Sequence, residues 1–137
     1  MSGDGFDEPA TLTKLAGTAA EGTYYTNFDA DMTTPDGKKF IDAYKKISGG
    51  KEPPSYGAAA YDSMGVILNA LIDYGTKNAG KAPTRPDLAR LVRATKAYKG
   101  LGGEITFDAK GDNPTSKVFV FQLVGGKDTN LGAAPQT

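Results

Sequence analysis

The stretch Tyr98–Gly126 reads YKGLGGEITFDAKGDNPTSKVFVFQLVGG and decides the fold. It predicts a short strand at Glu104–Phe107, where polar and apolar residues alternate, followed by a hairpin turn at Asp108–Asp112. The next predicted strand, Val118–Val124, is apolar at six of its seven positions. A strand that is apolar on both faces needs cover on both faces, as the inner strands of an α/β sheet have. The pattern therefore predicts a larger sheet than this chain supplies.

Strand and helix patterns precede this stretch. Thr23–Phe28 is rich in β-forming residues and predicts the first strand. Thr34-Pro35 predicts the start of a helix, and Gly49-Gly50 predicts its end. A second helix is predicted over Tyr56–Tyr74, and we expect it to be buried between layers because its apolar positions run nearly all round. A third helix is predicted to begin at Thr84–Asp87.

The predicted fold class is α/β, with about three helices and three strands. Residues 1–17 are predicted to be loop with at most a helical turn near Thr11–Ala16. Residues 1–126 form the structured portion, and residues 127–137, which have no pattern, are predicted to be a flexible tail. Two accounts of Val118–Val124 stay open at this point. Either two helices cover it in a free-standing domain, or the chain is a fragment of a larger α/β protein.

The composition excludes several classes of function. The chain of 137 residues has 16 basic and 16 acidic residues, so no net field favours nucleic acid. It contains no Cys and no His, which removes disulfides, thiolate metal sites and the usual general base. We therefore expect no enzyme activity, no catalytic residues, no cofactor and no metal.

The sequence matches neither a targeting pattern nor a calcium-binding pattern. The start at Met1 has neither a basic nor an apolar leader region, so the leader of a secreted protein would lie elsewhere. The apolar-rich stretch Tyr56–Ile72 is too short and too polar to span a bilayer. An EF-hand loop counted from Asp29 would need Gly and Glu where Thr34 and Phe40 stand.

Two residues are candidates for ligand binding. Asp4 lies between Gly3 and Gly5, and an acid with that backbone freedom can point into a cleft and accept hydrogen bonds. The plainer alternative is a disordered acidic terminus. Tyr56 follows two prolines at the start of the predicted second helix, and its plainer alternative is a packing or capping aromatic.

Four segments in order resemble the C-terminal part of the type I periplasmic binding proteins of branched-chain amino acid (Leu/Ile/Val) ABC transporters. The closing segment is the most specific, because that family typically ends with a G-x-(I/L)-x-(F/W)-D-x-x-G-D hairpin and a strand ending near Gln. The four segments read SGDG at Ser2–Gly5, LAGTAAEGTYYT at Leu15–Thr26, SYGAAAYDSMGVILNAL at Ser55–Leu71 and GGEITFDAKGDNPTSKVFVFQLVGG at Gly102–Gly126.

The resemblance implies a solute receptor with two α/β lobes that close on a small ligand. It places Asp4 where the family's acidic residue holds the ligand's α-ammonium, and Tyr56 where an aromatic residue lines the pocket. It also implies an ABC permease as partner and a periplasmic or extracytoplasmic location. Residues 1–126 would then hold segments of both lobes.

The chain departs from the family in two ways. Family members commonly carry Glu where Asp4 stands, and a full receptor is much longer, so the chain resembles a fragment with Met1 added. We expect the isolated fragment to bind ligand weakly or not at all, and to form a homodimer or swap elements to cover Val118–Val124. Two alternatives stay open: a ligand-sensing or regulatory module for amides or aromatic acids, and a free-standing α/β interaction domain.

Overall fold

The computed structural model describes residues 9–28, 30 and 32–135, which fall into two compact units. The sheet unit comprises residues 9–28, 54–56 and 117–135. The helical unit comprises residues 30, 32–53 and 57–116. Both units mix helices with strands, which confirms the α/β class, although four α-helices and five strands are present in the described residues where about three of each were expected.

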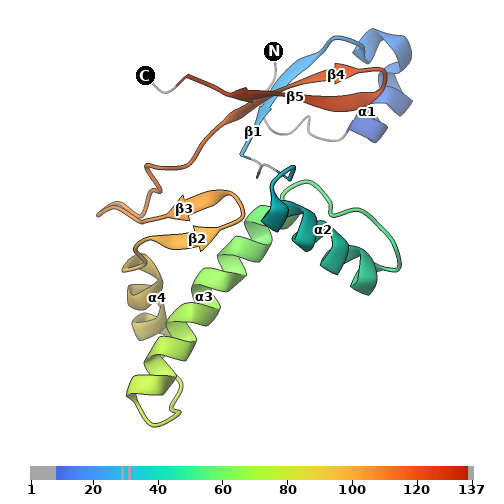
Figure 1. Ribbon diagram of the computed structural model, residues 1–137. Helices are drawn as coiled ribbons and strands as arrows, with labels where there is room; N and C mark the ends of the chain where they lie inside the picture. The colour runs from blue at the N-terminus through green and yellow to red at the C-terminus, as the bar shows by residue number, and fades with distance from the viewer. Residues whose placement is uncertain (1–8, 29, 31, 136–137) are drawn as a thin grey trace. The chain divides into compact units, whose positions relative to one another are not determined.

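The sheet unit is built on a three-stranded antiparallel sheet in the order β1-β4-β5 (Figure 1). Its elements are α1 (Pro9–Ala16), the 3₁₀ turn η2 (Gly17–Ala20), β1 (Tyr24–Asn27), β4 (Phe119–Val124) and β5 (Lys127–Ala133). Strand β4 is central, as its apolar sequence indicates. The Tyr25 and Phe121 rings stack with centroids 5.5 Å apart. The side chains of Tyr25 and Leu123 are fully buried.

The predicted hairpin between Glu104–Phe107 and Val118–Val124 is wrong. Strand β3 (Gly103–Ile105) pairs with β2 (Tyr98–Gly100), whereas β4 pairs with β1 and β5. An apolar pattern predicts a strand but does not predict which strand pairs with it. The turn between the two predicted strands leads into a loop.

The predicted tail also differs from the structure, since Lys127–Ala133 forms β5. Gly125 and Gly126 both have positive φ (60° and 74°), the backbone of a two-residue type I′ turn that returns the chain along β4. The Glu21 carboxylate accepts a hydrogen bond from Gly125 N at 2.6 Å and holds this turn. All side chains of β5 are exposed, and the strand is held by its backbone hydrogen bonds to β4. Its sequence therefore has no alternating apolar pattern.

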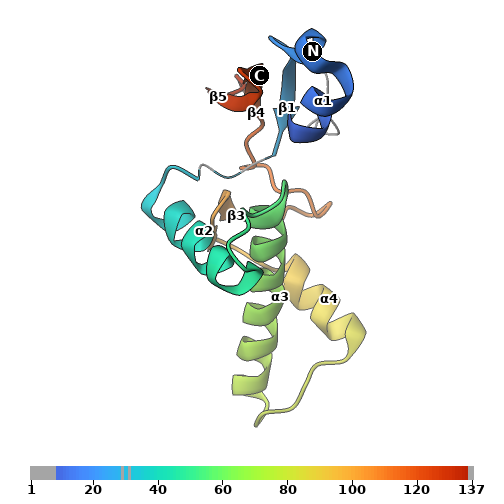
Figure 2. The ribbon, with the colours of Figure 1, turned by 90° about the vertical axis from the view of Figure 1, so that its right-hand side faces the viewer.

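The helical unit contains three helices and a short hairpin (Figure 2). Its elements are α2 (Pro35–Ser48), α3 (Gly57–Lys77), α4 (Arg85–Arg93), β2 and β3. The expected caps of α2 are present: the Thr34 hydroxyl accepts from Gly37 N at 3.1 Å, and Gly49 ends the helix with φ 71°. None of the described helices is both long and apolar enough to cross a membrane.

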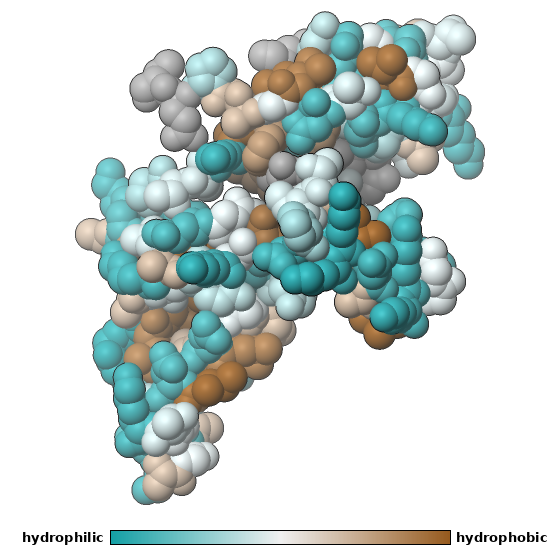
Figure 3. Space-filling view, in the orientation of Figure 1, coloured by the Kyte–Doolittle hydropathy of each residue, from teal (hydrophilic) through white to brown (hydrophobic). Residues whose placement is uncertain are grey.

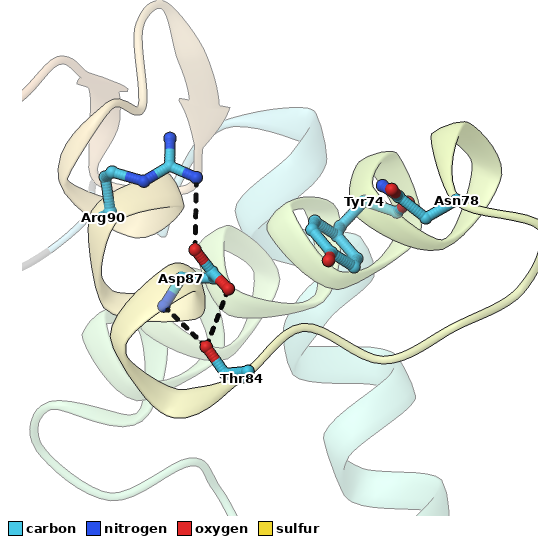
Figure 4. Close-up of polar contacts among 5 residues, drawn as sticks. All are labelled: Tyr74, Asn78, Thr84, Asp87 and Arg90. Atoms are coloured by element: carbon cyan, nitrogen blue, oxygen red, sulfur yellow. Dashed lines mark hydrogen bonds and ion pairs between the residues drawn. The ribbon is translucent and has the colours of Figure 1, made fainter.

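Thr84 begins α4 as predicted (Figure 4). Its hydroxyl accepts from Asp87 N at 3.3 Å and donates to Asp87 Oδ2 at 2.7 Å. Arg90 donates to the other carboxylate oxygen at 3.4 Å. The Thr84 hydrogen bond comes first among the causes that lower the pKa of Asp87.

Helix α3 is not buried between layers, which corrects the expectation for Tyr56–Tyr74. Of its side chains only Ala58, Asp62 and Val66 are buried. Asp62 contacts the β2–β3 turn, and Val66 lies beside residues of α4 within the helical unit. Elsewhere on the helix, Tyr61 packs against Phe40 of α2, whereas Met64, Leu68 and Ile72 are exposed.

The β2–β3 hairpin lies so close to α3 that one position of the helix must be glycine. A Cβ on Gly65 would overlap the hydroxyl oxygen of Tyr98 and lie 2.9 Å from its Cζ. Burial is the main cause that raises the pKa of Tyr98, and the Asp62 charge adds to it. The ring therefore occupies a confined place against the helix.

We expect Gly65→Ala to lower the free energy of unfolding by about 1–3 kcal/mol, because the Tyr98 ring must move out of its place. Gly75→Ala is the matched control on the same helix, since its nearest new neighbour would be 3.9 Å away. It should raise stability by about 0.5–1 kcal/mol through helix propensity. Urea unfolding of both variants checks this, and equal effects would contradict the close packing.

Candidate functional site

Of the two predicted ligand-binding residues, the structure describes Tyr56. Asp4 lies outside the described residues. Tyr56 lies in the sheet unit, directly before the first residue of α3, and its side chain is 40% exposed. Part of its ring is therefore accessible, as a residue that lines a pocket requires.

The backbone of Tyr56 is unusual. Its φ of 65° lies in the left-handed region, which bulky residues rarely adopt. Such conformations cost roughly 1–3 kcal/mol and gather at functional positions. Sequence reasoning did not predict it, because left-handed backbone is normally signalled by Gly or Asn. This strain fits a position at which the direction of the aromatic ring matters more than local stability.

The residue that sequence reasoning missed is Asp62, which is 4% exposed on α3. Its Oδ1 accepts a hydrogen bond from Leu101 N at 2.8 Å, and its Oδ2 accepts one from Gly102 N at 2.9 Å. A Cβ on Gly100 would lie 2.5 Å from Oδ2, so the turn can approach only because Gly100 has no side chain. Asp62 thus anchors the turn between β2 and β3 to the helix.

A signal for Asp62 was present in the sequence. It is the only charged residue in the apolar-rich stretch Tyr56–Ile72, and a buried acid needs partners. Both carboxylate oxygens accept hydrogen bonds from backbone N–H groups, so Asp62 acts as a structural acceptor.

Two hollows lie within the helical unit. The first, of about 460 Å³, is lined by Phe40, Tyr61, Asp62, Tyr98 and other residues. The Phe40 and Tyr61 rings lie 5.2 Å apart there. The second, of about 640 Å³, lies between α3 and α4, and the Tyr74 and Asn78 side chains of its lining are visible in Figure 4. Both mix charged and apolar side chains without a convergent set of polar groups.

The Asp108–Asp112 turn is closed by its own first carboxylate. Asp108 Oδ1 accepts from the backbone N–H groups of Lys110, Gly111 and Asp112 at 2.8 to 2.9 Å. Arg93 of α4 donates to the Lys110 carbonyl at 2.8 Å. The hydrogen bond from Asp112 N is the main cause that lowers the pKa of Asp108. In the part of the chain that is described, no group of acidic side chains could hold a metal ion.

Comparison with known proteins supplies what this geometry leaves open. The sequence profile of a family described as "Periplasmic binding protein" matches residues 3–128. Leu/Ile/Val-binding protein homolog 2 of Brucella abortus is 30% identical over 128 residues, which are 93% of this chain and 32% of that protein.

Solved structures of similar proteins give the same family relationship. A leucine-binding protein of Thermotoga maritima is 32% identical, with a TM-score of 0.75 over 96% of this chain and 35% of that one. The isoleucine complex of a branched-chain amino acid transporter substrate-binding protein from Streptococcus pneumoniae is 23% identical and shares the fold, with a TM-score of 0.76 over 96% and 36%. The chain spans about a third of the length of each of these relatives.

Asp62→Ala should destabilise the chain by roughly 2–4 kcal/mol, because it leaves the Leu101 and Gly102 amides without their acceptor. Asp62→Asn keeps one acceptor oxygen, so its loss of stability should be smaller than that of Asp62→Ala. Asp73→Ala, at an exposed acid of the same helix, should change stability by less than about 0.5 kcal/mol. Urea unfolding that gave equal values for Asp62→Ala and Asp73→Ala would show that the anchor contributes nothing.

Asp108 gives a prediction about pH. Because its pKa is lower in the folded than in the unfolded chain, its contribution is present above the unfolded pKa. The contribution is lost as pH falls through the folded pKa. Asp108→Asn should therefore be less stable than the native chain at pH 7, and the gap should close in acid. Chemical unfolding between pH 7 and pH 3 measures this gap, and a gap independent of pH would contradict it.

Proposed function

The chain belongs to the periplasmic binding protein family, in its branched-chain amino acid group, and on that premise we propose that it is part of a solute receptor for an ABC importer. The ligand we propose is a small amino acid, bound in a cleft between two lobes. The observation that carries the proposal is the 30% identity to a Leu/Ile/Val-binding protein homolog over 93% of this chain. Relatives of this kind are solute-binding proteins, and we assign no catalysis to the chain.

The proposed site contains two residues with different chemical roles. Asp4 would accept hydrogen bonds from the ligand's ammonium group, since charge-assisted bonds of this kind are strong in a dry cleft. Tyr56 would offer an apolar ring face and a hydroxyl. Its partial exposure and its left-handed backbone support this role.

The two compact units support the proposal that the chain carries segments of both lobes. The chain passes between the units after residue 29, on either side of residues 54–56, and after residue 116. Tyr56 stands at one of these passages. An extracytoplasmic location and an ABC permease as partner follow from the same proposal. The comparisons give no support to the predicted homodimer or domain swap.

Asp4→Ala in the longer parental receptor should weaken binding of leucine, isoleucine or valine by about 2–5 kcal/mol, because the ammonium loses its buried counter-charge. Titration calorimetry measures the affinity. Asp7→Ala, at a nearby acid that the family pattern does not select, is the matched control. Unchanged affinity in Asp4→Ala would overturn the assigned role.

The same calorimetry separates the roles of the Tyr56 ring and hydroxyl. Tyr56→Phe should retain most of the affinity, whereas Tyr56→Ala should lose it. A ligand panel that includes amides and aromatic acids tests the alternative of a ligand-sensing module. Binding of those compounds without binding of amino acids would favour that alternative.

A further inference from the structure

The basic residues of the chain are unevenly distributed. Residues 77–99 contain seven basic side chains and one acidic one, so the rest of the chain carries nine basic and 15 acidic side chains. The zero net charge of the chain therefore hides a strongly positive segment. We call its seven basic residues the basic cluster, and all of them are exposed. The basic cluster consists of Lys77, Lys81, Arg85, Arg90, Arg93, Lys96 and Lys99.

Three members of the basic cluster lie on the outer side of α4. At about 100° per residue, Arg85, Arg90 and Arg93 fall within an arc of about 140° around the helix. The half-buried Leu88 and Leu91 lie on the opposite side. The first and last of these arginines are about 12 Å apart along the helix axis. Figure 3 shows hydrophilic surface at the outer edge of the molecule where α4 lies.

Three further members surround the hollow between α3 and α4. Lys77, Lys96 and Lys99 all line this hollow of about 640 Å³, together with one acid, Asp73. Lys77 is the last residue of α3, and the other two lysines follow α4 in the chain. Lys81 belongs to the connection between the two helices. The positive charge is therefore concentrated on and around one short helix.

Neighbouring acids offset little of this charge. Asp87 is the acid of the segment, and it forms an ion pair with Arg90 at 3.4 Å. The other six members form no ion pair with any residue that the structure describes. Arg93 and Lys96 donate instead to neutral backbone carbonyls beyond β3. Asp108, whose pKa is lowered in part by the charge of Lys96, already accepts from three backbone N–H groups.

Helix ends do not account for the basic cluster. A cation in the last turn of a helix is stabilised by the helix dipole, which explains Arg90 and Arg93. Arg85 is the first residue of α4, where a cation opposes the same dipole. Lys81 and Lys99 lie outside the helices. The charges at these three positions therefore have no local structural reason.

The basic cluster fits a surface of dense negative charge without an apolar centre. In the described part of the chain, no large apolar side chain that is exposed lies within residues 77–99. Protein interfaces have an apolar or aromatic centre and are depleted in lysine. A bilayer with anionic headgroups requires only positive charge, and clusters of four to eight Lys and Arg residues bind it.

We propose that the basic cluster docks the chain on the anionic headgroups of a membrane surface. The contact is peripheral, because the apolar side of α4 is turned into the helical unit and only its charged side faces outward. This inference goes beyond the proposed function and does not require a bound amino acid.

Co-sedimentation with lipid vesicles tests the proposal. The 137-residue chain is mixed with vesicles that contain phosphatidylglycerol and with vesicles of phosphatidylcholine alone. The partition coefficient should be at least about tenfold higher on the anionic vesicles. Added salt should lower it, because charges more than about 10 Å apart are screened at about 0.1 M ionic strength.

A fourfold variant assigns the binding to the basic cluster. It combines Lys77→Gln, Lys81→Gln, Arg85→Gln and Lys99→Gln, and leaves in place the members that pair with Asp87 or hold carbonyls. Its partition to anionic vesicles should be at least about tenfold weaker than that of the native chain. Circular dichroism and urea unfolding show that the variant is folded.

The matched control removes the same charge from α2. It combines Lys38→Gln, Lys39→Gln, Lys45→Gln and Lys46→Gln. Two of these lysines already form ion pairs, Lys39 with Asp36 at 2.9 Å and Lys45 with Glu52 at 2.6 Å. The control should keep most of the vesicle binding. Equal losses in the two variants would overturn the assignment to the basic cluster.

The remaining outcomes also decide the proposal. Equal binding to both kinds of vesicle, or binding to neither, would overturn it. Capture by immobilised polyglutamate without binding to anionic vesicles would overturn it too, and would assign the basic cluster to an acidic protein. Amino-acid binding is measured separately by calorimetry, so its absence alongside salt-sensitive vesicle binding would refute the proposed function and leave this inference standing.

Discussion

The helical unit depends on one buried carboxylate. Asp62 brings a negative charge into a site that is almost closed to water, and two backbone N–H groups of the β2–β3 turn offset the cost of burying it. The same contact requires glycine at position 100, while the neighbouring Tyr98 requires glycine at position 65. Helix and hairpin therefore hold each other through a few positions that tolerate little change.

Local chemistry made most of the helices predictable. Thr34 and Thr84 cap helices where the sequence indicated, and Gly49 ends α2 in the left-handed conformation that glycine favours. Pairing was not predictable in the same way. Strands β3 and β4 follow each other in the chain yet belong to different sheets, because the side-chain pattern of a strand does not record its neighbour.

The candidate site shows the same division. Asp4 and Tyr56 were selected by their resemblance to a family pattern, since an acid between glycines and an exposed tyrosine have ordinary explanations. Asp62 was open to physical reasoning, because an acid in an apolar helix needs hydrogen-bond partners. The left-handed backbone of Tyr56 could not be predicted, because tyrosine does not favour a positive φ.

Strand β5 has a consequence for the solubility of the chain. Strand β4 contains no charge and no proline, and it is rich in β-forming residues, which are the properties of segments that assemble into fibrils. Its two edges are occupied by β1 and β5. The outer strand β5 carries Lys127 and Asp128, and charged side chains on an edge discourage pairing with another molecule. The polar strand β5 thus shields one edge of an aggregation-prone segment from pairing with another molecule.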